Sequence, residues 1–320
     1  MQNDHQLIQD ASLPLCYLLD EPATLEDLVI DSTEGMEDHI LVCLHRRVIN
    51  MFKFVYNLRS PNMKPEELQD IVLLCTSLPN NRMFELINRF PKVYFMVGNC
   101  RHPDDLLRAG VKRAKQVVVM SEKENLDQCE RNSDSPAIMT SHIMDLLLQE
   151  PRKDSFRIVN LVEKSNIRFM HLLQGKDVAE EVDVFYTPAY AAGDVVVDSL
   201  ISNVLLSQTY YKPDIVSIIK TLCGMPGPSN TAQTTNGPHL TSIPMPSRFM
   251  DKPFAQLFEE LILEYGVLPL GLVRAPDEAM GNELPFVYTN PVPSLMLKGT
   301  DTIYVLAPPR WSFSDHYRTQ

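Results

Sequence analysis

Long hydrophobic runs are missing from this chain of 320 residues. No window approaches the roughly 20 uninterrupted apolar residues that a membrane-spanning helix needs. The nearest candidate, 189–206, is broken by Asp194 and Asp198. The N-terminus has no cationic segment followed by an apolar core, so we expect no signal peptide. The sequence as given therefore predicts a soluble chain.

Cysteine pairs and an excess of positive charge are also missing. The six cysteines form no C-x-x-C pair, and Cys43 and Cys75 lie in predicted buried strands, so we expect free thiols in a reducing compartment. The formal net charge of -12 argues against nucleic acid or an anionic membrane as a partner, because both need a cationic surface. With 44% hydrophobic and 22% charged residues, the composition is that of a globular protein.

Strands alternate with helices over residues 38–187. Continuous apolar runs are typical of strands that helices cover on both faces, and they predict strands at 40–44, 71–75, 93–97, 117–120, 156–162 and 182–185. Helical spacing of apolar residues predicts helices at 48–58, 81–90, 106–111, 136–149 and 166–173. This alternation predicts an α/β fold with a Rossmann-like, doubly wound parallel sheet.

A different organisation is predicted beyond residue 187. A helical crossover pair is expected over 188–223, with helices at 189–208 and 214–222. Residues 224–248 are rich in Pro, Gly, Asn, Thr and Ser, which favours a flexible loop. A small α+β C-terminal lobe is expected over 249–308, with a helix at 254–265 and strands at 267–273, 286–289 and 302–306. Residues 1–37 are interpreted as a lead-in or linker, and 309–320 as a tail.

The predicted sheet lacks the features of a dinucleotide site. The first β–α turn, 45–50, contains no glycine that would let the backbone approach a pyrophosphate. The second strand ends in Cys75-Thr76-Ser77, where an acidic residue would hold a ribose hydroxyl. There is also no nucleophile elbow, no H-E-x-x-H motif and no P-loop. We therefore expect neither a nucleotide cofactor nor an enzyme.

Several motifs resemble RCK domains, the cytosolic regulators of potassium channels and transporters. DDLLRAGV at 104–111, followed by QVVVMSE at 116–122, resembles the RCK pattern in which an L-x-x-A-G-V helix leads into an apolar strand. Other segments resemble the second RCK domain of the Slo family of large-conductance, ligand-gated potassium channels: FPKV at 90–93, SNIRFM at 165–170, YTPAYAAG at 186–193, YTNP at 288–291 and GTDTIY at 299–304. The resemblance covers residues 38–308.

The resemblance implies a regulatory domain at the cytoplasmic face of a membrane. In such channels two RCK domains per subunit and four subunits build a gating ring, so the implied partners are the first RCK domain and the neighbouring subunits of the same channel. The crossover helices would contact the partner RCK domain through Tyr190, Gly193, Val196, Leu200 and Val204. Two alternatives stay open. This apolar stripe could pack on its own sheet, or the chain could be a soluble RCK-like nucleotide- or ligand-sensing or scaffold protein without its own pore.

The resemblance also implies a regulatory ion, either Ca²⁺ or Na⁺. In the calcium-activated branch an aspartate-rich loop before the crossover helix binds calcium, and the corresponding candidate ligands here are Asp177, Glu180, Glu181 and Asp183. Four carboxylates could supply part of the six to eight oxygens that calcium prefers. Two apolar residues interrupt them and the dense aspartate run is missing. We therefore favour a solvated acidic loop, and expect calcium binding there to be weak or absent.

Overall fold

The computed structural model describes residues 16–45, 51–59, 65–121, 134–148, 156–174, 195–223, 238–277, 285–308 and 311. The chain forms two compact units. The sheet unit is built from Tyr17–Arg59 and Glu66–Ser207, and the C-terminal unit mainly from Gln208–Gln320.

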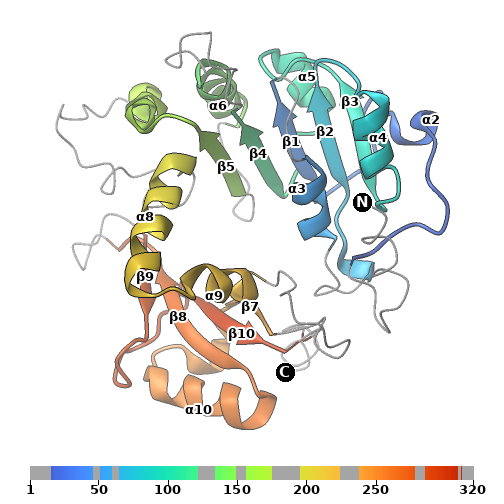
Figure 1. Ribbon diagram of the computed structural model, residues 1–320. Coiled ribbons are helices and arrows are strands. Elements are labelled where there is room, and N and C mark those ends of the chain that lie inside the picture. The colour runs from blue at the N-terminus through green and yellow to red at the C-terminus, as the bar shows by residue number, and fades with distance from the viewer. Residues whose placement is uncertain are drawn as a thin grey trace. The chain divides into compact units, whose positions relative to one another are not determined.

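A parallel sheet of six strands forms the centre of the sheet unit (Figure 1). Its strand order is β3-β2-β1-β4-β5-β6, so the direction of winding reverses between β1 and β4. The bounds are β1 Ile40–Leu44, β2 Ile71–Cys75, β3 Val93–Val97, β4 Gln116–Met120, β5 Phe156–Leu161 and β6 Val195–Val197. Every residue of β1 and β2 is buried, as expected for central strands covered on both faces. The predicted fold class is confirmed.

Helices flank this sheet. They are α2 Leu25–Leu28, α3 Met51–Leu58, α4 Asn81–Ile87, α5 Pro103–Arg108 and α6 Ser135–Leu147, with 3-10 helices η1 Pro65–Glu67 and η3 Lys164–Gln174. The Asn80 side chain accepts a hydrogen bond from Met83 N and begins α4. Leu41 and Cys43 of β1 share a core with Leu106 of α5 and Met144 of α6. Side chains alternate along a strand, so the intervening residues of β1 face the side of α3 and α4.

The segment before β1, expected to be a lead-in, packs on the sheet unit from residue 17 onward. The Thr24 side chain and Asp27 form a capping box at α2. Further along, Ile30 N donates to Phe95 O over 2.9 Å, which joins this segment to β3. Thr33 is completely buried. These contacts make residues 17–37 part of the sheet unit.

One predicted helix is corrected by the structure. The sequence predicted a helix over 189–208, but Val195–Val197 form β6 and the helix, α8 Asp198–Tyr211, begins after them. Three consecutive β-branched side chains favour a strand, and Val195 and Val197 bury themselves by pairing with β5. Residues 189–194 and the predicted strand at 182–185 lie outside the described residues.

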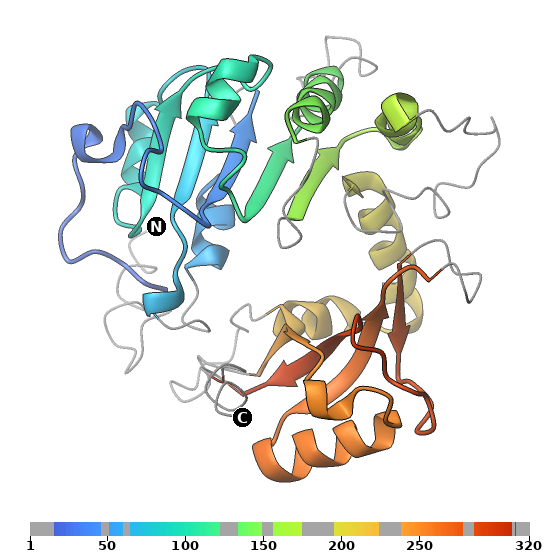
Figure 2. The same ribbon diagram turned by 180° about the vertical axis from the view of Figure 1, so that it is seen from behind.

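An antiparallel sheet of order β7-β10-β8-β9 forms the C-terminal unit, and α10 packs along β8 (Figure 2). The elements are α9 Ile215–Leu222, β7 His239–Pro244, η5 Ser247–Phe249, α10 Phe254–Tyr265, β8 Leu268–Arg274, β9 Phe286–Thr289 and β10 Thr302–Ala307. The prediction of a flexible loop over 224–248 is wrong at 239–244, because all six residues of β7 pair with β10. Pairing with a distant strand overrides the local composition.

Candidate functional site

The carboxyl edge of the parallel sheet is the first place to look for a ligand. Open α/β sheets bind ligands where the strand order reverses, which here is between β1 and β4. His45 follows β1 at this point. Its Nδ1 lies 3.1 Å from Met120 O at the end of β4, and its Nε2 lies 2.8 Å from Thr140 Oγ1 on α6.

Both ring nitrogens of His45 are therefore engaged. A carbonyl oxygen only accepts, so Nδ1 donates to Met120 and Nε2 accepts from the Thr140 hydroxyl. Burial lowers the pKa of His45 below its usual value, which favours this neutral ring. The His45 side chain therefore joins β1, β4 and α6 and stabilises the fold at this edge of the sheet. The rest of the glycine-free turn, 46–50, lies outside the described residues.

A second buried polar group at this edge, Asp134, holds the end of β5. Its carboxylate accepts from Val162 N at 2.8 Å, Glu163 N at 2.9 Å and Asn166 Nδ2 at 2.8 Å. Three donors satisfy a completely buried side chain and tie the start of α6 to the turn after β5. The carboxylate therefore fixes the fold at this edge.

The predicted metal ligands cannot be placed. Asp177, Glu180, Glu181 and Asp183 all fall outside the described residues. Within the described ranges, no group of three His, Cys, Asp or Glu side chains is arranged to hold a metal ion.

The cysteines are free thiols where the structure describes them. Cys16, Cys43, Cys75 and Cys100 are buried, and Cys223 is exposed. Cys43 and Cys75 lie in β1 and β2, as the sequence predicted.

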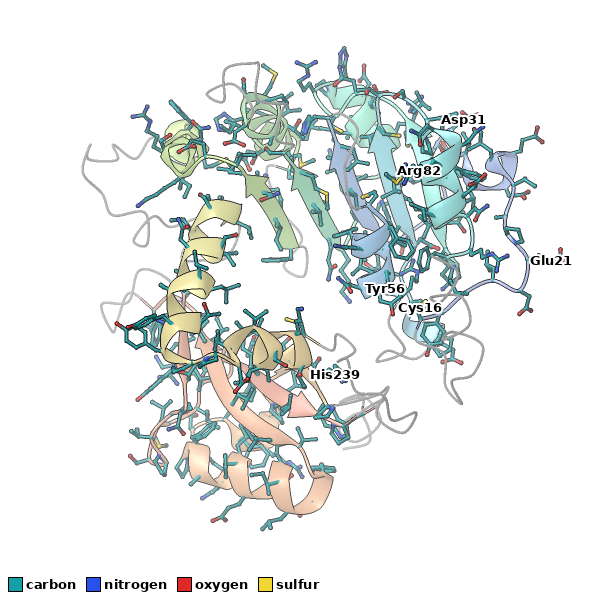
Figure 3. The ribbon with its side chains drawn as sticks, viewed as in Figure 1. Cys16, Glu21, Asp31, Tyr56, Arg82 and His239 are labelled. Carbon is teal, nitrogen blue, oxygen red and sulfur yellow. The ribbon has the colours of Figure 1, made fainter. Side chains whose placement is uncertain are left out.

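Helices α8 and α9 present the most exposed apolar side chains near the predicted interface. No residue of α9 is buried. On α8 the exposed large side chains are Ile201, Val204, Leu206, Tyr210 and Tyr211, with exposed fractions of 45%, 49%, 73%, 83% and 76%. Figure 3 shows side chains projecting along both helices. We call these five residues the α8 surface; at 100° per residue, Ile201, Val204 and Tyr211 share one side of the helix, and Leu206 and Tyr210 lie on the opposite side.

The interface residues predicted from the sequence fall in different environments. Val204 belongs to the α8 surface. Leu200 packs against the core of the sheet unit, as the alternative interpretation expected for the stripe. Val196 lies half-buried in β6, paired with Asn160. Tyr190 and Gly193 lie outside the described residues.

Sequence reasoning missed three members of the α8 surface, Leu206, Tyr210 and Tyr211. The predicted helix ended at residue 208, but α8 continues through Tyr210 and Tyr211. Their rings stack edge to face with centroids 5.1 Å apart. The available signal was Pro213 itself, because a helix commonly runs to within a residue or two of a proline.

Two family models match the chain. Residues 35–171 match the calcium-activated potassium channel slowpoke-like RCK domain, and residues 239–307 match the Ca²⁺-activated K⁺ channel Slowpoke, TrkA_C like domain. The first match covers β1 to η3, and the second covers the antiparallel sheet of the C-terminal unit. Between them lie α8 and α9.

Curated relatives and a solved structure agree with these matches. The chain is 22% identical to the calcium-activated potassium channel slo-1 of Caenorhabditis elegans over 88% of this chain and 30% of the relative. It is 23% identical to potassium channel subfamily T member 1 of Gallus gallus over 86% of this chain and 24% of the relative. The human SLO3 gating ring has the same fold, with a TM-score of 0.74 and 22% identity over 97% of this chain and 55% of that chain.

These observations define the class first. The chain has the parts of an RCK domain: a parallel sheet whose carboxyl edge is held by hydrogen bonds of His45, an exposed helix pair and an antiparallel lobe. The chain belongs to the Slo family of potassium-channel RCK domains. It spans about a quarter to a third of the length of the curated relatives. None of the helices in the described ranges combines the length and apolar character needed to cross a membrane.

Proposed function

We propose that this chain is the second RCK domain of the cytosolic gating ring of a Slo-type potassium channel, where it couples the binding of an intracellular ion to pore opening. The observation that carries this proposal is the α8 surface, whose large apolar side chains stand exposed between the two segments that match the family models. Covering such side chains removes apolar area from water and stabilises an assembly.

The partner in this proposal is the first RCK domain of the same subunit, within a ring of four subunits. Val204, a member of the α8 surface, is the predicted interface residue whose side chain is exposed and apolar. The similar solved structure is a gating ring, which supports the choice of partner. The membrane is then reached only through the transmembrane part of the channel, and no nucleic acid is involved.

The proposed role is regulatory and not catalytic. Support comes from the family descriptions, which name channel domains, and from His45, whose two nitrogens are already engaged and which is not poised as a general base. Ca²⁺ or Na⁺ is the proposed regulatory ligand. The names of the relatives as calcium-activated channels support an ion of this kind.

A recording of the full-length channel tests this function. A transcript containing this chain, expressed in oocytes, should carry potassium current whose open probability changes with internal Ca²⁺ or Na⁺. Val204→Asp should weaken that ion dependence, since it places a charge in the buried interface. Asn203→Asp adds the same charge at a neighbouring exposed polar position and should leave the dependence unchanged. Surface expression without potassium current would overturn the proposal.

A further inference from the structure

The sheet unit contains an apolar pocket that the gating role does not use. It lies at the carboxyl end of β2, on the side of the sheet that faces α3 and α4. Leu73, Cys75 and Phe95 contribute from β2 and β3, and Met51, Met83 and Ile87 contribute from the two helices. Its volume is about 80 Å³. About 10–15 Å³ on the same measure holds one water molecule, so the pocket has room for a small organic molecule.

Among the residues that the structure describes, none that lines this pocket carries a charged side chain. Arg82, labelled in Figure 3, lies next to Met83 on α4 but is exposed and does not line it. A phosphate or carboxylate that entered would lose its hydration without gaining a cationic partner, which is strongly unfavourable. The described lining therefore disfavours nucleotides and other anions.

The few polar groups of the pocket are also neutral or already engaged. Burial raises the pKa of the Cys75 thiol to about 11, so it stays protonated, and its Sγ lies 3.7 Å from Met96 O. Asn80 Oδ1 accepts from Met83 N over 2.9 Å. Neither group carries a charge that could bind a ligand. The specificity of the pocket therefore depends on shape and on dispersion contacts.

Two methionines and one aromatic ring determine which kind of apolar ligand the pocket favours. Met51 and Met83 are flexible and polarisable, and thioether sulfurs contact aromatic rings favourably. Phe95 offers a ring for offset or edge-to-face packing. A flat, uncharged ring satisfies both features.

We propose that this pocket binds a small, uncharged aromatic molecule of about the size of indole. Leu78 also lines it and is 39% exposed, which places Leu78 where a ligand enters. Binding would stabilise the sheet unit through mass action, because the unfolded chain has no such pocket. The site is separate from the α8 surface, so it stands whether or not the gating proposal holds.

Titration of the intact chain with 5-fluoroindole, followed by ¹⁹F NMR, tests the site. Leu78→Trp should weaken binding about tenfold, because the larger ring fills the entrance while the partly exposed position tolerates it. Leu86→Trp is the matched control: Leu86 lies on α4, is 46% exposed and does not line the pocket, so binding should change less than twofold. Circular dichroism checks that both variants are folded. Equal effects of the two variants, or no binding by the wild-type chain, would overturn the proposal.

A second readout uses the wild-type chain alone. With ¹³C-labelled methionine methyl groups, indole should shift the signals of Met51 and Met83, and leave that of Met250, on the C-terminal unit, in place. Shifts of Met250 as large as those of the two pocket methionines would mean non-specific binding and contradict the site. Displacement of indole by ADP would contradict the uncharged ligand class.

Discussion

Arg274 of β8 and Asp301, directly before β10, form a buried two-point ion pair in the C-terminal unit. Arg274 Nη2 lies 2.8 Å from Asp301 Oδ2, and Arg274 Nε lies 3.1 Å from Oδ1. The Asp301 side chain is fully buried. It also accepts from Lys298 N at 2.8 Å, while Arg274 donates to Met296 O at 2.8 Å. The pair therefore fixes the loop that leads into β10.

Asp301→Asn should destabilise the C-terminal unit by about 3–5 kcal/mol, because it leaves a buried guanidinium without its carboxylate. Urea unfolding followed by the fluorescence of Trp311 measures this unit, since this single tryptophan packs against its core. The control is Asp277→Asn, which removes the partner of Lys298 in a pair whose side chains are 32% and 30% exposed. That loss should be about 1 kcal/mol or less. Equal losses would contradict the account of the buried pair.

Gly110→Ala should destabilise the sheet unit more than Gly35→Ala does. Both glycines have positive φ, +73° and +84°, where a Cβ costs about 1–2 kcal/mol. At Gly110 a Cβ would also lie 2.5 Å from Thr33 Oγ1 and 2.9 Å from His39 Cε1, whereas at Gly35 it would meet nothing within 4 Å. Thermal unfolding followed by circular dichroism compares the two. A smaller loss of stability for Gly110→Ala than for Gly35→Ala would mean that the Thr33 and His39 side chains move aside at little energetic cost.

His39 should make the sheet unit less stable in mild acid. Its Nε2 lies 3.0 Å from Ala109 O, and the residue is fully buried. Burial is the main cause that lowers its pKa below 6.5. The hydrogen bond to Ala109 O is the largest opposing effect; the charge of Arg113 lowers the pKa further, and Asp70 and Asp38 raise it. The unfolded chain then binds more protons, so this contribution is complete above about pH 6.5 and is lost as the pH falls below that value.

The measurement is the urea midpoint of the sheet unit at pH 7.5 and pH 5.5, followed by circular dichroism. The wild-type chain should lose stability at the lower pH, and His39→Gln should reduce that loss while lowering stability at pH 7.5. His102→Gln changes an exposed histidine and should keep the wild-type pH dependence. An unchanged pH dependence in His39→Gln would show that other groups, such as His45, cause it.

The central strands could be predicted from the sequence because their environment is simple. The runs at 40–44 and 71–75 are apolar at every position, and β1 and β2 have those bounds since both faces are covered. The bounds of α10 and β9 were also predicted correctly. It failed at β6, where Val195–Val197 also fit a helical stripe, and at β7, whose formation depends on a strand far along the chain.

The candidate sites were less predictable than the fold. The motif around Gly110 indicated the family, but no sequence pattern shows that its glycine packs against Thr33 and His39. The apolar pocket brings together β2, β3, α3 and α4, so it depends on tertiary contacts between residues distant in sequence. Exposure of the α8 surface likewise depends on tertiary packing, which leaves Tyr210 and Tyr211 largely uncovered.

Calcium should bind weakly or not at all to the acidic loop at 177–183. Its four carboxylates lack the dense aspartate run, and weakly organised carboxylates keep their water more readily than they gather around a cation. Isothermal titration calorimetry of the intact chain with CaCl₂ gives the affinity. Micromolar binding that disappears in both Asp177→Asn and Glu180→Gln would contradict this expectation and place the ion site in the loop.

The proposed assembly through the α8 surface is tested most directly by mixing this chain with the separately expressed first RCK domain of the same channel. Light scattering of the mixture should give a complex heavier than the 36.4 kDa of this chain by at least the mass of the partner. Val204→Asp should abolish the complex, and Asn203→Asp should leave it unchanged, with both variants folded. Separate masses for the two proteins at every concentration, or a complex that Val204→Asp does not weaken, would contradict the assembly role of the α8 surface.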